Sequence, residues 1–265
     1  NMDLGLKGRV AIVGGSSRGI GRAIALAFAQ EGASVTICAR TEADLRRTEI
    51  ELARVGSQHH VLAIPADLSV ARDIRRVVRD TVNRFGQIGI LVTRLGHAET
   101  GLPSEFSDDA ITGAMERNFM APIRLAREVV PYMKQQRWGR IINLLPSQVK
   151  HVIHDQALGI SSELALLGYS KMLSNELAPF NITVNNVITG PVKTEFAGLG
   201  LESQAQKTNY PSEESAKETT GQIPMRRLGN PDEIASLVAF LGSDRAAYMT
   251  GTKVVIDGGR LQTLE

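Results

Sequence analysis

The feature that most constrains the fold is a regular alternation between short aliphatic or β-branched runs and longer amphipathic stretches. Such short runs predict buried strands, and apolar positions at helical spacing predict helices between them. The expected strands are 10–13, 34–38, 61–64, 88–92, 139–144, 183–187 and 253–256, and the expected helices are 21–31, 42–55, 71–85, 108–134, 161–177 and 231–241. This alternation predicts an α/β fold with a doubly wound parallel sheet. With no internal repeat and no flexible linker, we expect a single domain over residues 1–265.

Composition excludes several classes of protein. The 265 residues are 43% hydrophobic, which supports a continuous core and argues against disorder. The formal net charge is +2 and the basic residues are scattered, so nucleic acid is not expected as a partner. The longest apolar stretches are far shorter than the ~20 residues of a membrane span, and we expect neither a signal peptide nor a membrane partner. The expected location is therefore the cytoplasm. The one cysteine, Cys38, is expected to be a buried structural thiol, and no metal site is expected.

A glycine-rich segment follows the first expected strand and leads directly into a helix. It reads Gly14-Gly-Ser-Ser-Arg-Gly-Ile-Gly21. Gly15 permits a tight turn, while Gly19 and Gly21 allow the backbone and the helix N-terminus to approach a pyrophosphate. The alternative is that these glycines serve only the turn. Their place at the first strand-to-helix junction favours a dinucleotide site.

Several motifs follow one another in the order found in the short-chain dehydrogenase/reductase (SDR) family. Besides the G-x-x-x-G-x-G loop, they are Asp67, Asn118, Asn185-Asn-Val-Ile-Thr-Gly-Pro-Val-Lys-Thr194, Ile223-Pro-Met-Arg-Arg-Leu-Gly-Asn-Pro-Asp-Glu-Ile-Ala235 and Thr250-Gly-Thr-Lys-Val-Val-Ile-Asp-Gly-Gly259. The chain therefore resembles this family over nearly its whole length, and its 3-oxoacyl-carrier-protein-reductase-like members in particular. The resemblance implies a Rossmann-type fold, a nicotinamide dinucleotide cofactor, and a carbonyl or alcohol substrate.

The end of the second expected strand bears on which cofactor binds. Family members that prefer NAD carry an acid near the position of Ala39, whereas Arg40 here can pair with a 2′-phosphate and Arg18 can assist. NADP(H) is therefore favoured over NAD, the alternative being that both arginines are solvated surface charges. By resemblance Asp67 accepts a hydrogen bond from the adenine amino group; alternatively it only caps the helix beginning near Ser69. The full set of expected cofactor-binding residues is Gly15, Ser17, Arg18, Gly19, Ile20, Gly21, Arg40, Asp67, Leu68, Gly96, Glu163, Ile188, Gly190 and Thr194.

The resemblance also locates the catalytic positions, and most of them have changed. The family uses an Asn, a Ser, a Tyr and a Lys, of which only the Asn is retained, as Asn118. Spacing from motifs on both sides places Pro146 at the Ser position, Gly159 at the Tyr position and Glu163 at the Lys position. A branch of the family that lacks the Tyr and Lys is similar in this respect. Proline has no hydroxyl, glycine has no proton to give, and glutamate reverses the charge that would stabilise a tyrosinate.

Other residues are candidates for the missing proton transfer. Ser147 lies one place after the expected serine, and His151 and His154 follow in the loop before the next helix. We expect the catalytic set to be Asn118, Ser147 and His154, although an exposed loop role is the alternative for the serine and both histidines. Tyr169 and Lys171 are ~12 to 15 Å along the helix from the expected positions, so Tyr169 is interpreted as a packing or subunit-contact residue and Lys171 as a solvated charge.

Two further segments shape the expected site. The strand ending Thr93-Arg-Leu-Gly96 replaces a family Asn-Asn-Ala-Gly run, so Arg94 either contacts phosphate or points to solvent. The polar segment 195–222 is expected to form loops or short helices beside the substrate, whose identity the sequence does not give.

These observations support two hypotheses about function. The first is an atypical NADP(H)-dependent SDR oxidoreductase with a non-standard proton donor acting on a small-molecule carbonyl or alcohol. The second is a homologue without turnover that binds NADP or a partner. In both we expect a homo-oligomer, a tetramer or a dimer, with Leu164, Leu167 and Leu173 on a wide apolar helix face.

Overall fold

A seven-stranded parallel sheet forms the centre of the molecule. The computed structural model describes residues 2–56, 58–94, 98–150, 154–194, 217 and 219–263. Strand order is β3-β2-β1-β4-β5-β6-β7, and all pairs are parallel. The strands are β1 (Val10–Gly14), β2 (Ser34–Ala39), β3 (Val61–Pro65), β4 (Ile90–Arg94), β5 (Gly139–Pro146), β6 (Ile182–Thr189) and β7 (Lys253–Ile256). This confirms the α/β fold with a doubly wound Rossmann-type sheet in a single domain.

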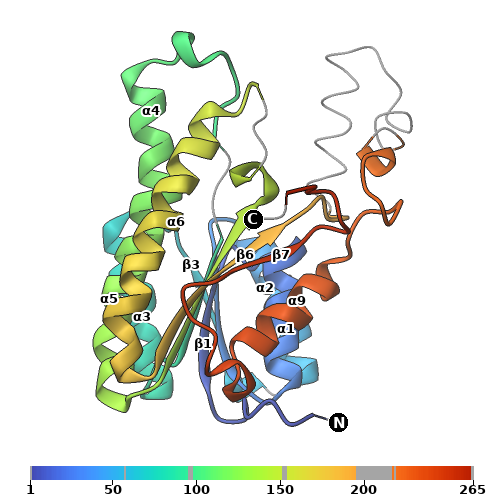
Figure 1. Cartoon of the computed structure of the whole chain (residues 1–265). Helices are drawn as coiled ribbons and strands as arrows, with labels where there is room; N and C mark the ends of the chain where they lie inside the picture. Colours follow the sequence, from blue (N-terminus) through green and yellow to red (C-terminus); the bar gives the residue numbers. More distant parts are fainter. Residues whose placement is uncertain are drawn as a thin grey trace.

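Helices cover both faces of this sheet (Figure 1). On one face lie α1 (Gly19–Gln30), α2 (Glu42–Val55) and α9 (Pro231–Leu241), and on the other lie α3 (Ala71–Phe85), α5 (Ala121–Gln136) and α6 (Ala157–Leu177). Each layer of helices buries its own apolar cluster against the sheet. The central strands are buried on both sides, which explains why their sequences are nearly continuous aliphatic runs, whereas the edge strand β7 is partly exposed.

Cys38, near the end of β2, lies within this core. Its side chain has no exposed surface, and burial raises the pKa of the thiol to about 12. The expected buried structural thiol is therefore confirmed.

Two of the expected helices differ most from those observed. The expected helix 108–134 is interrupted, because α4 (Asp108–Met115) and α5 are joined by a π-helical turn, Glu116–Met120. Pro122 has no N–H to donate to the carbonyl of Asn118 four residues earlier, so regular α-helical bonding cannot continue there. Helix α6 begins at Ala157 rather than at residue 161, which places Gly159 and Glu163 one turn apart on the same helix.

Short 3-10 segments complete the connections between these elements. They are Gln58–His60, Pro103–Glu105, Ser147–Val149, Ala178–Phe180 and Asp244–Ala246. The turn Ser147–Val149 follows β5 directly, so it lies at the carboxyl end of the sheet.

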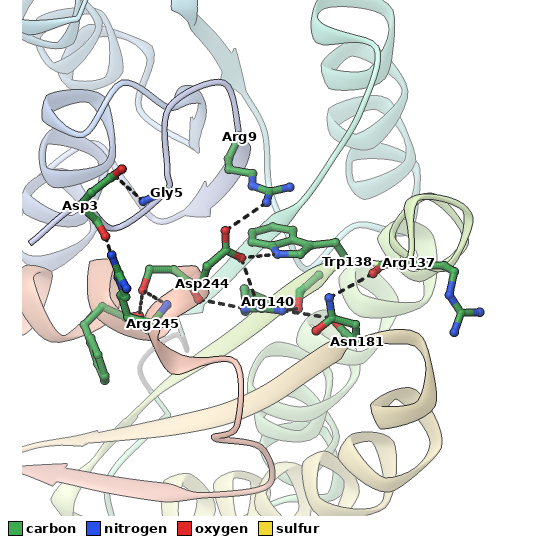
Figure 2. A network of polar contacts seen from close by, with 12 residues as sticks. Asp3, Gly5, Arg9, Arg137, Trp138, Arg140, Asn181, Asp244 and Arg245 are labelled. Carbon is green, nitrogen blue, oxygen red and sulfur yellow. Dashed lines mark hydrogen bonds and ion pairs between the residues drawn. The ribbon is translucent and has the colours of Figure 1, made fainter.

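A charged network ties together the amino ends of the central strands (Figure 2). Asp244 accepts hydrogen bonds from the Trp138 indole nitrogen (2.7 Å) and from Arg9 (3.3 Å). The fully buried Arg140 donates to the carbonyls of Gly139 (2.8 Å), Asn181 (3.0 Å) and Ser243 (3.1 Å). Both arginines also lie against the Trp138 ring, at 3.7 Å for Arg9 and 4.5 Å for Arg140. At this end of the sheet, Asp244 is therefore the acid partner of both Arg9 and Arg140.

Candidate active site

The order of the strands creates a crevice at the carboxyl ends of β1 and β4. The chain runs outward from β1 to β3 and then returns to the other side of β1 as β4. The loops that leave β1 and β4 therefore diverge, and ligands of open α/β sheets bind at such a point. The glycine-rich loop leaves β1 there, and Arg94 ends β4.

The glycine-rich loop has the tight geometry that the sequence predicted. Gly15 has a left-handed φ of +63°, and a Cβ on Gly21 would lie 2.3 Å from the carbonyl oxygen of Gly15. A side chain at position 21 would therefore force the loop away from helix α1. The backbone nitrogen of Gly15 also donates to the carbonyl of Cys38 (3.0 Å), which fixes the loop to β2.

The N-terminus of α1 is open to an anion. Arg18, its N-cap residue, makes no side-chain cap hydrogen bond, and the first turn contains no acidic residue. The first backbone N–H groups of a helix have no partner within the helix and favour negative charge. Thr194 lies beside this turn, because a Cβ on Gly19 would contact its methyl group at 3.3 Å.

Three arginines surround the loop. The stem of Arg94 lies 3.7 Å from the position of a Cβ on Gly15, and burial together with the nearby charge of Arg18 lowers the pKa of its guanidinium. Within the described residues Arg94 has no hydrogen bond and no ion pair. Arg18 and Arg40 are exposed. Burying a cation without an acid partner costs free energy, and an anionic ligand bound beside it would offset that cost.

Asp67 lies near Arg40 but uses one carboxylate oxygen locally. That oxygen accepts hydrogen bonds from the Ser69 hydroxyl (2.7 Å) and backbone nitrogen (2.9 Å). The Ser69 hydroxyl is the main cause that lowers the Asp67 pKa, and the positive charge of Arg40 adds to it. The helix that follows begins at Ala71, with Val70 as its N-cap, so Asp67 stabilises the preceding turn rather than the helix itself. The adenine contact stays a prediction.

A cavity of about 220 Å³ lies between this loop, the end of β5 and the first turns of α6. It brings together Pro146, Gly159 and Glu163, the three residues that the sequence predicts at the family's Ser, Tyr and Lys positions. The other residues that line it are Ile20, Arg94, Ala98, Glu99, Thr100, Leu144, Leu145, Gln148, Gln156 and Thr189. A bridge between Gly101 and Gln156 joins the segment after β4 to the start of α6 beside the cavity.

Glu163 is the buried acid in this cavity. Its side chain is 5% exposed, and burial raises its pKa to about 8. Its Oε1 lies 3.8 Å from the position of a Cβ on Gly159. In the part of the chain that the structure describes, no donor or cation pairs with this carboxyl. At neutral pH the group therefore holds a proton that an ordinary glutamate would have lost.

Asn118 lies in the π-helical turn and is fully buried. Its side-chain nitrogen donates to the Ser162 hydroxyl (3.2 Å), which connects it to the residue before Glu163. Its Oδ1 is buried without a hydrogen-bond partner. Buried unpaired acceptors are uncommon and are often sites where a water or ligand donates.

The structure places none of the three predicted catalytic residues, Asn118, Ser147 and His154, in the lining of the cavity. Ser147 is buried in the 3-10 turn after β5, and His154 is exposed in a turn before α6; neither lines the cavity. Their roles as proton donors stay predictions. Tyr169 packs edge-on against Phe119 (centroids 6.1 Å apart), as a packing residue should, and Lys171 donates to the carbonyl of Gly251 (3.4 Å).

The remaining predicted site residues divide between the cavity and the sheet. Ile20 lines the cavity, Leu68 lies against Gly14, and Ile188 is buried in β6. The backbone nitrogen of Gly190 bonds to the Ile256 carbonyl (2.9 Å), and the Ser17 carbonyl accepts from Thr48 (2.9 Å). Gly96, His151 and residues 195–216 of the predicted substrate segment lie outside the described residues.

Sequence reasoning missed Gln148. It lines the cavity, and its Oε1 is buried without a hydrogen-bond partner. Its position two residues beyond the end of β5 was the available signal, because ligand-binding residues of such sheets follow the carboxyl ends of strands.

Two structural features typical of other classes of function are absent from the described residues. None of the described helices is long and apolar enough to cross a membrane. Across the same part of the chain, no group of three or more His, Cys, Asp or Glu side chains is placed to hold a metal ion.

Comparison with known proteins gives matches over almost the whole chain. A family model described as enoyl-(acyl carrier protein) reductase matches residues 15–260. The chain is 32% identical to a 3-oxoacyl-[acyl-carrier-protein] reductase of Vibrio cholerae over 256 residues, 97% of this chain and 98% of the relative. It is also similar in structure to L-sorbose reductase of Gluconobacter frateurii complexed with NADPH and L-sorbose, with a TM-score of 0.94, 30% identity, and coverage of 99% and 100%. An actinorhodin polyketide ketoreductase with NADPH matches with a TM-score of 0.90, 30% identity, and coverage of 96% and 98%.

Proposed function

The chain belongs to the short-chain dehydrogenase/reductase family, and from this premise we propose that it is an NADP(H)-dependent oxidoreductase with a non-standard proton donor. At the coarser level it is a nicotinamide-dependent SDR oxidoreductase that acts on a carbonyl, similar to the 3-oxoacyl reductases and ketoreductases. The proposal adds the preference for NADP(H) and the atypical catalytic set, in which Pro146, Gly159 and Glu163 stand where the family has Ser, Tyr and Lys.

The observation that supports it best is the junction between the glycine cradle and the cavity. The approach of Gly21 to Gly15, the open N-terminus of α1 and Arg94, which has no partner among the described residues, fit a pyrophosphate. The cavity with Glu163 begins beside them. When bound, a reduced nicotinamide supplies a hydride to a carbonyl carbon. The chain itself holds the phosphates, shapes the cavity and provides polar groups at the carbonyl.

We assign the preference for NADP(H) to Arg40 and Arg18. Both are exposed beside the loop, and Arg40 acts electrostatically on Asp67, so its charge lies at the adenosine end of the expected site. The L-sorbose reductase and the polyketide ketoreductase to which the chain is similar both contain NADPH in their structures. Ile188, Gly190 and Thr194 are proposed for the nicotinamide and pyrophosphate, with Glu163 near the ribose.

The alternative function is a homologue that binds cofactor or a partner without turnover. It is favoured by the absence of a hydroxyl, a phenol and an ammonium at positions 146, 159 and 163, which all line the cavity. The two functions predict the same cofactor binding and differ only in turnover.

The experiment that separates them follows NADPH consumption at 340 nm in the presence of carbonyl substrates. The panel contains an acetoacetyl thioester, L-sorbose and a cyclic diketone, with NADH as the parallel cofactor. We expect NADPH-dependent turnover on at least one of them. NADPH binding without turnover on this panel would favour the alternative, and absence of binding would contradict both.

We also propose that the chain forms a homo-oligomer through α4, α5 and α6. Leu164 is 48% exposed and Met172 is 69% exposed on α6. Leu167 and Leu173, which the sequence predicts on the same face, pack in part against the chain's own core. Sedimentation velocity at micromolar concentration should show a dimer or tetramer, and a monomer would contradict the proposal.

A further inference from the structure

The cavity contains few groups that can transfer a proton. Among the described residues that line it, the titratable ones are Arg94, Glu99 and Glu163. Glu99 is exposed, and a guanidinium stays charged at neutral pH. Glu163 is the buried one of the two carboxyls, and it lies on the rigid helix α6 rather than on a loop.

The absence of a side chain at Gly159 opens the space in front of this carboxyl. Glu163 lies one helical turn after Gly159, and its Oε1 is 3.8 Å from the position that a Cβ on Gly159 would occupy. Among the described residues, a Cβ there would meet this oxygen and, at 3.7 Å, the Cβ of Ala98. The carboxyl therefore extends back along the helix toward the position where the family carries its tyrosine.

We propose that Glu163 is the proton donor of this enzyme, replacing the tyrosine whose position is taken by Gly159. The inference rests on the proposed function. In the reduction, a hydride from the reduced nicotinamide dinucleotide forms the new C–H bond and the π electron pair of the C=O bond moves to oxygen. That oxygen takes the proton of the Glu163 carboxyl, the O–H bond of the acid breaks, and the glutamate is left as a carboxylate. Water then returns a proton to Glu163, and the product is an alcohol.

The electrostatic surroundings suit this role. Burial raises the pKa of Glu163 to about 8, so the carboxyl is mainly protonated at pH 7. Among the described residues, the charged groups that face the cavity from other elements are Arg94, from the end of β4, and Glu99, from the segment after it. Arg94 is the cation of the two, and within this part of the chain it forms no ion pair with Glu163. An acid whose pKa is close to the working pH is well matched to general acid catalysis.

The first test detects the protonation state of the Glu163 carboxyl by spectroscopy and does not require turnover. Infrared difference spectra of the NADP⁺-bound protein, wild type minus Glu163→Gln, are recorded from pH 6 to pH 10. We expect a protonated-carboxyl band that is present at pH 7, disappears with a midpoint near pH 8, and is missing in the variant. The control is Glu176→Gln, which lies on the same helix but is exposed and paired with Lys134. An ionised Glu163 at pH 6 would overturn the proposal.

The second test measures turnover with the carbonyl that the wild type reduces best. Glu163→Gln should lower kcat by ~10²- to 10⁴-fold at pH 7, whereas the dissociation constant for NADPH should change by less than about threefold because the amide keeps an acceptor for a ribose hydroxyl. Glu163→Asp keeps a transferable proton and should recover part of the rate, and the wild-type rate should fall above about pH 8.

The outcomes of the two tests separate the inference from the proposed function. Wild-type turnover that is unchanged in Glu163→Gln would overturn the role of Glu163 while leaving the oxidoreductase intact. No turnover on any carbonyl, with NADPH bound, would remove the proposed function and with it this role. A large loss in Glu163→Gln with unchanged NADPH binding, together with the missing infrared band, would support both.

Discussion

The buried charges at the two ends of the sheet differ in whether they have partners. At the amino ends, Arg9 and Arg140 share Asp244 and stack on Trp138, and Arg140 also donates to three carbonyls (Figure 2). At the carboxyl ends, Arg94 and Glu163 lie in one cavity, and within the described chain neither has a partner. The same core supports both ends, so the difference does not come from the fold.

The comparison indicates which end of the sheet contributes mainly to stability and which contributes mainly to function. A buried charge is tolerated when it is paired, and removing one partner of such a pair is strongly destabilising. Polar groups left unpaired inside a protein lower its stability, and they persist at sites that a ligand or a reaction completes. The amino-end network therefore predicts effects on folding, and the carboxyl-end cavity predicts effects on binding and catalysis.

The largest expected effect on stability is at the amino end. Asp244→Ala leaves the buried Arg140 without its counter-ion and removes the acceptor for Trp138. We expect the free energy of unfolding to fall by about 3 kcal/mol. Urea unfolding measures it, with Asp80→Ala as the control because that ion pair with Arg79 is exposed. A loss below about 1 kcal/mol, which is typical of surface pairs, would show that the network contributes little.

The next largest effect is the pH dependence that Glu163 imposes. Its pKa in the folded protein, about 8, lies above the ordinary value of 4.5. The unfolded chain therefore loses this proton first, and the stability that is present below about pH 4.5 is lost as pH rises through about 8. Between pH 6 and 8 the wild type should lose about 2 kcal/mol more than Glu163→Gln does.

Urea unfolding at a series of pH values checks this prediction. Glu176→Gln serves as the matched control, since the wild-type carboxylate there is exposed. Parallel stability curves for wild type and Glu163→Gln would show that the carboxyl is ionised in the folded protein.

Substituting Arg94 should weaken NADPH binding without lowering the stability of the fold. Arg94→Leu removes a partly buried guanidinium that has no described partner, so the free energy of unfolding should stay the same or rise. NADPH affinity should fall about tenfold, as expected for one charge-assisted phosphate contact. Calorimetric titration measures it, with Arg245→Leu as a control at the amino end. A destabilised variant with unchanged affinity would reverse our assignment of the two ends.

The smallest expected effect concerns the choice of cofactor. Arg40 is exposed, so solvent screens its contact with a 2′-phosphate. Arg40→Ala should reduce the preference for NADPH over NADH by about three- to tenfold, less than a buried contact would. Parallel titrations with both cofactors check it, and an unchanged preference would leave the 2′-phosphate to other residues.

Much of the fold was predictable because local patterns determine it. The bounds of α2, α3, α9 and β7 agree with those expected from the sequence, since each is a clear periodic run with a distinct beginning and end. The π-helical turn was missed because hydrophobic periodicity does not register one extra residue in a turn. The start of α6 was missed because Gly159 has a low helix propensity, which packing overrides.

The site was predictable only in part, for a related reason. Spacing placed Pro146, Gly159 and Glu163 at the catalytic positions, and the structure brings all three into one cavity. Whether a carboxyl is buried and unpaired depends on residues far apart in the chain, so the sequence predicted for Glu163 only a role near the ribose. The unpaired Gln148 oxygen and the missing partner of Arg94 are likewise properties of the tertiary structure.

The most direct test of the contrast between the two ends is a calorimetric titration of NADPH into the wild-type protein at pH 7. We expect one NADPH site per chain with a dissociation constant on the order of micromolar, and we expect the melting temperature to rise when the site is filled. Absence of both heat and thermal stabilisation would contradict the claim that the unpaired groups at the carboxyl ends are kept for this ligand.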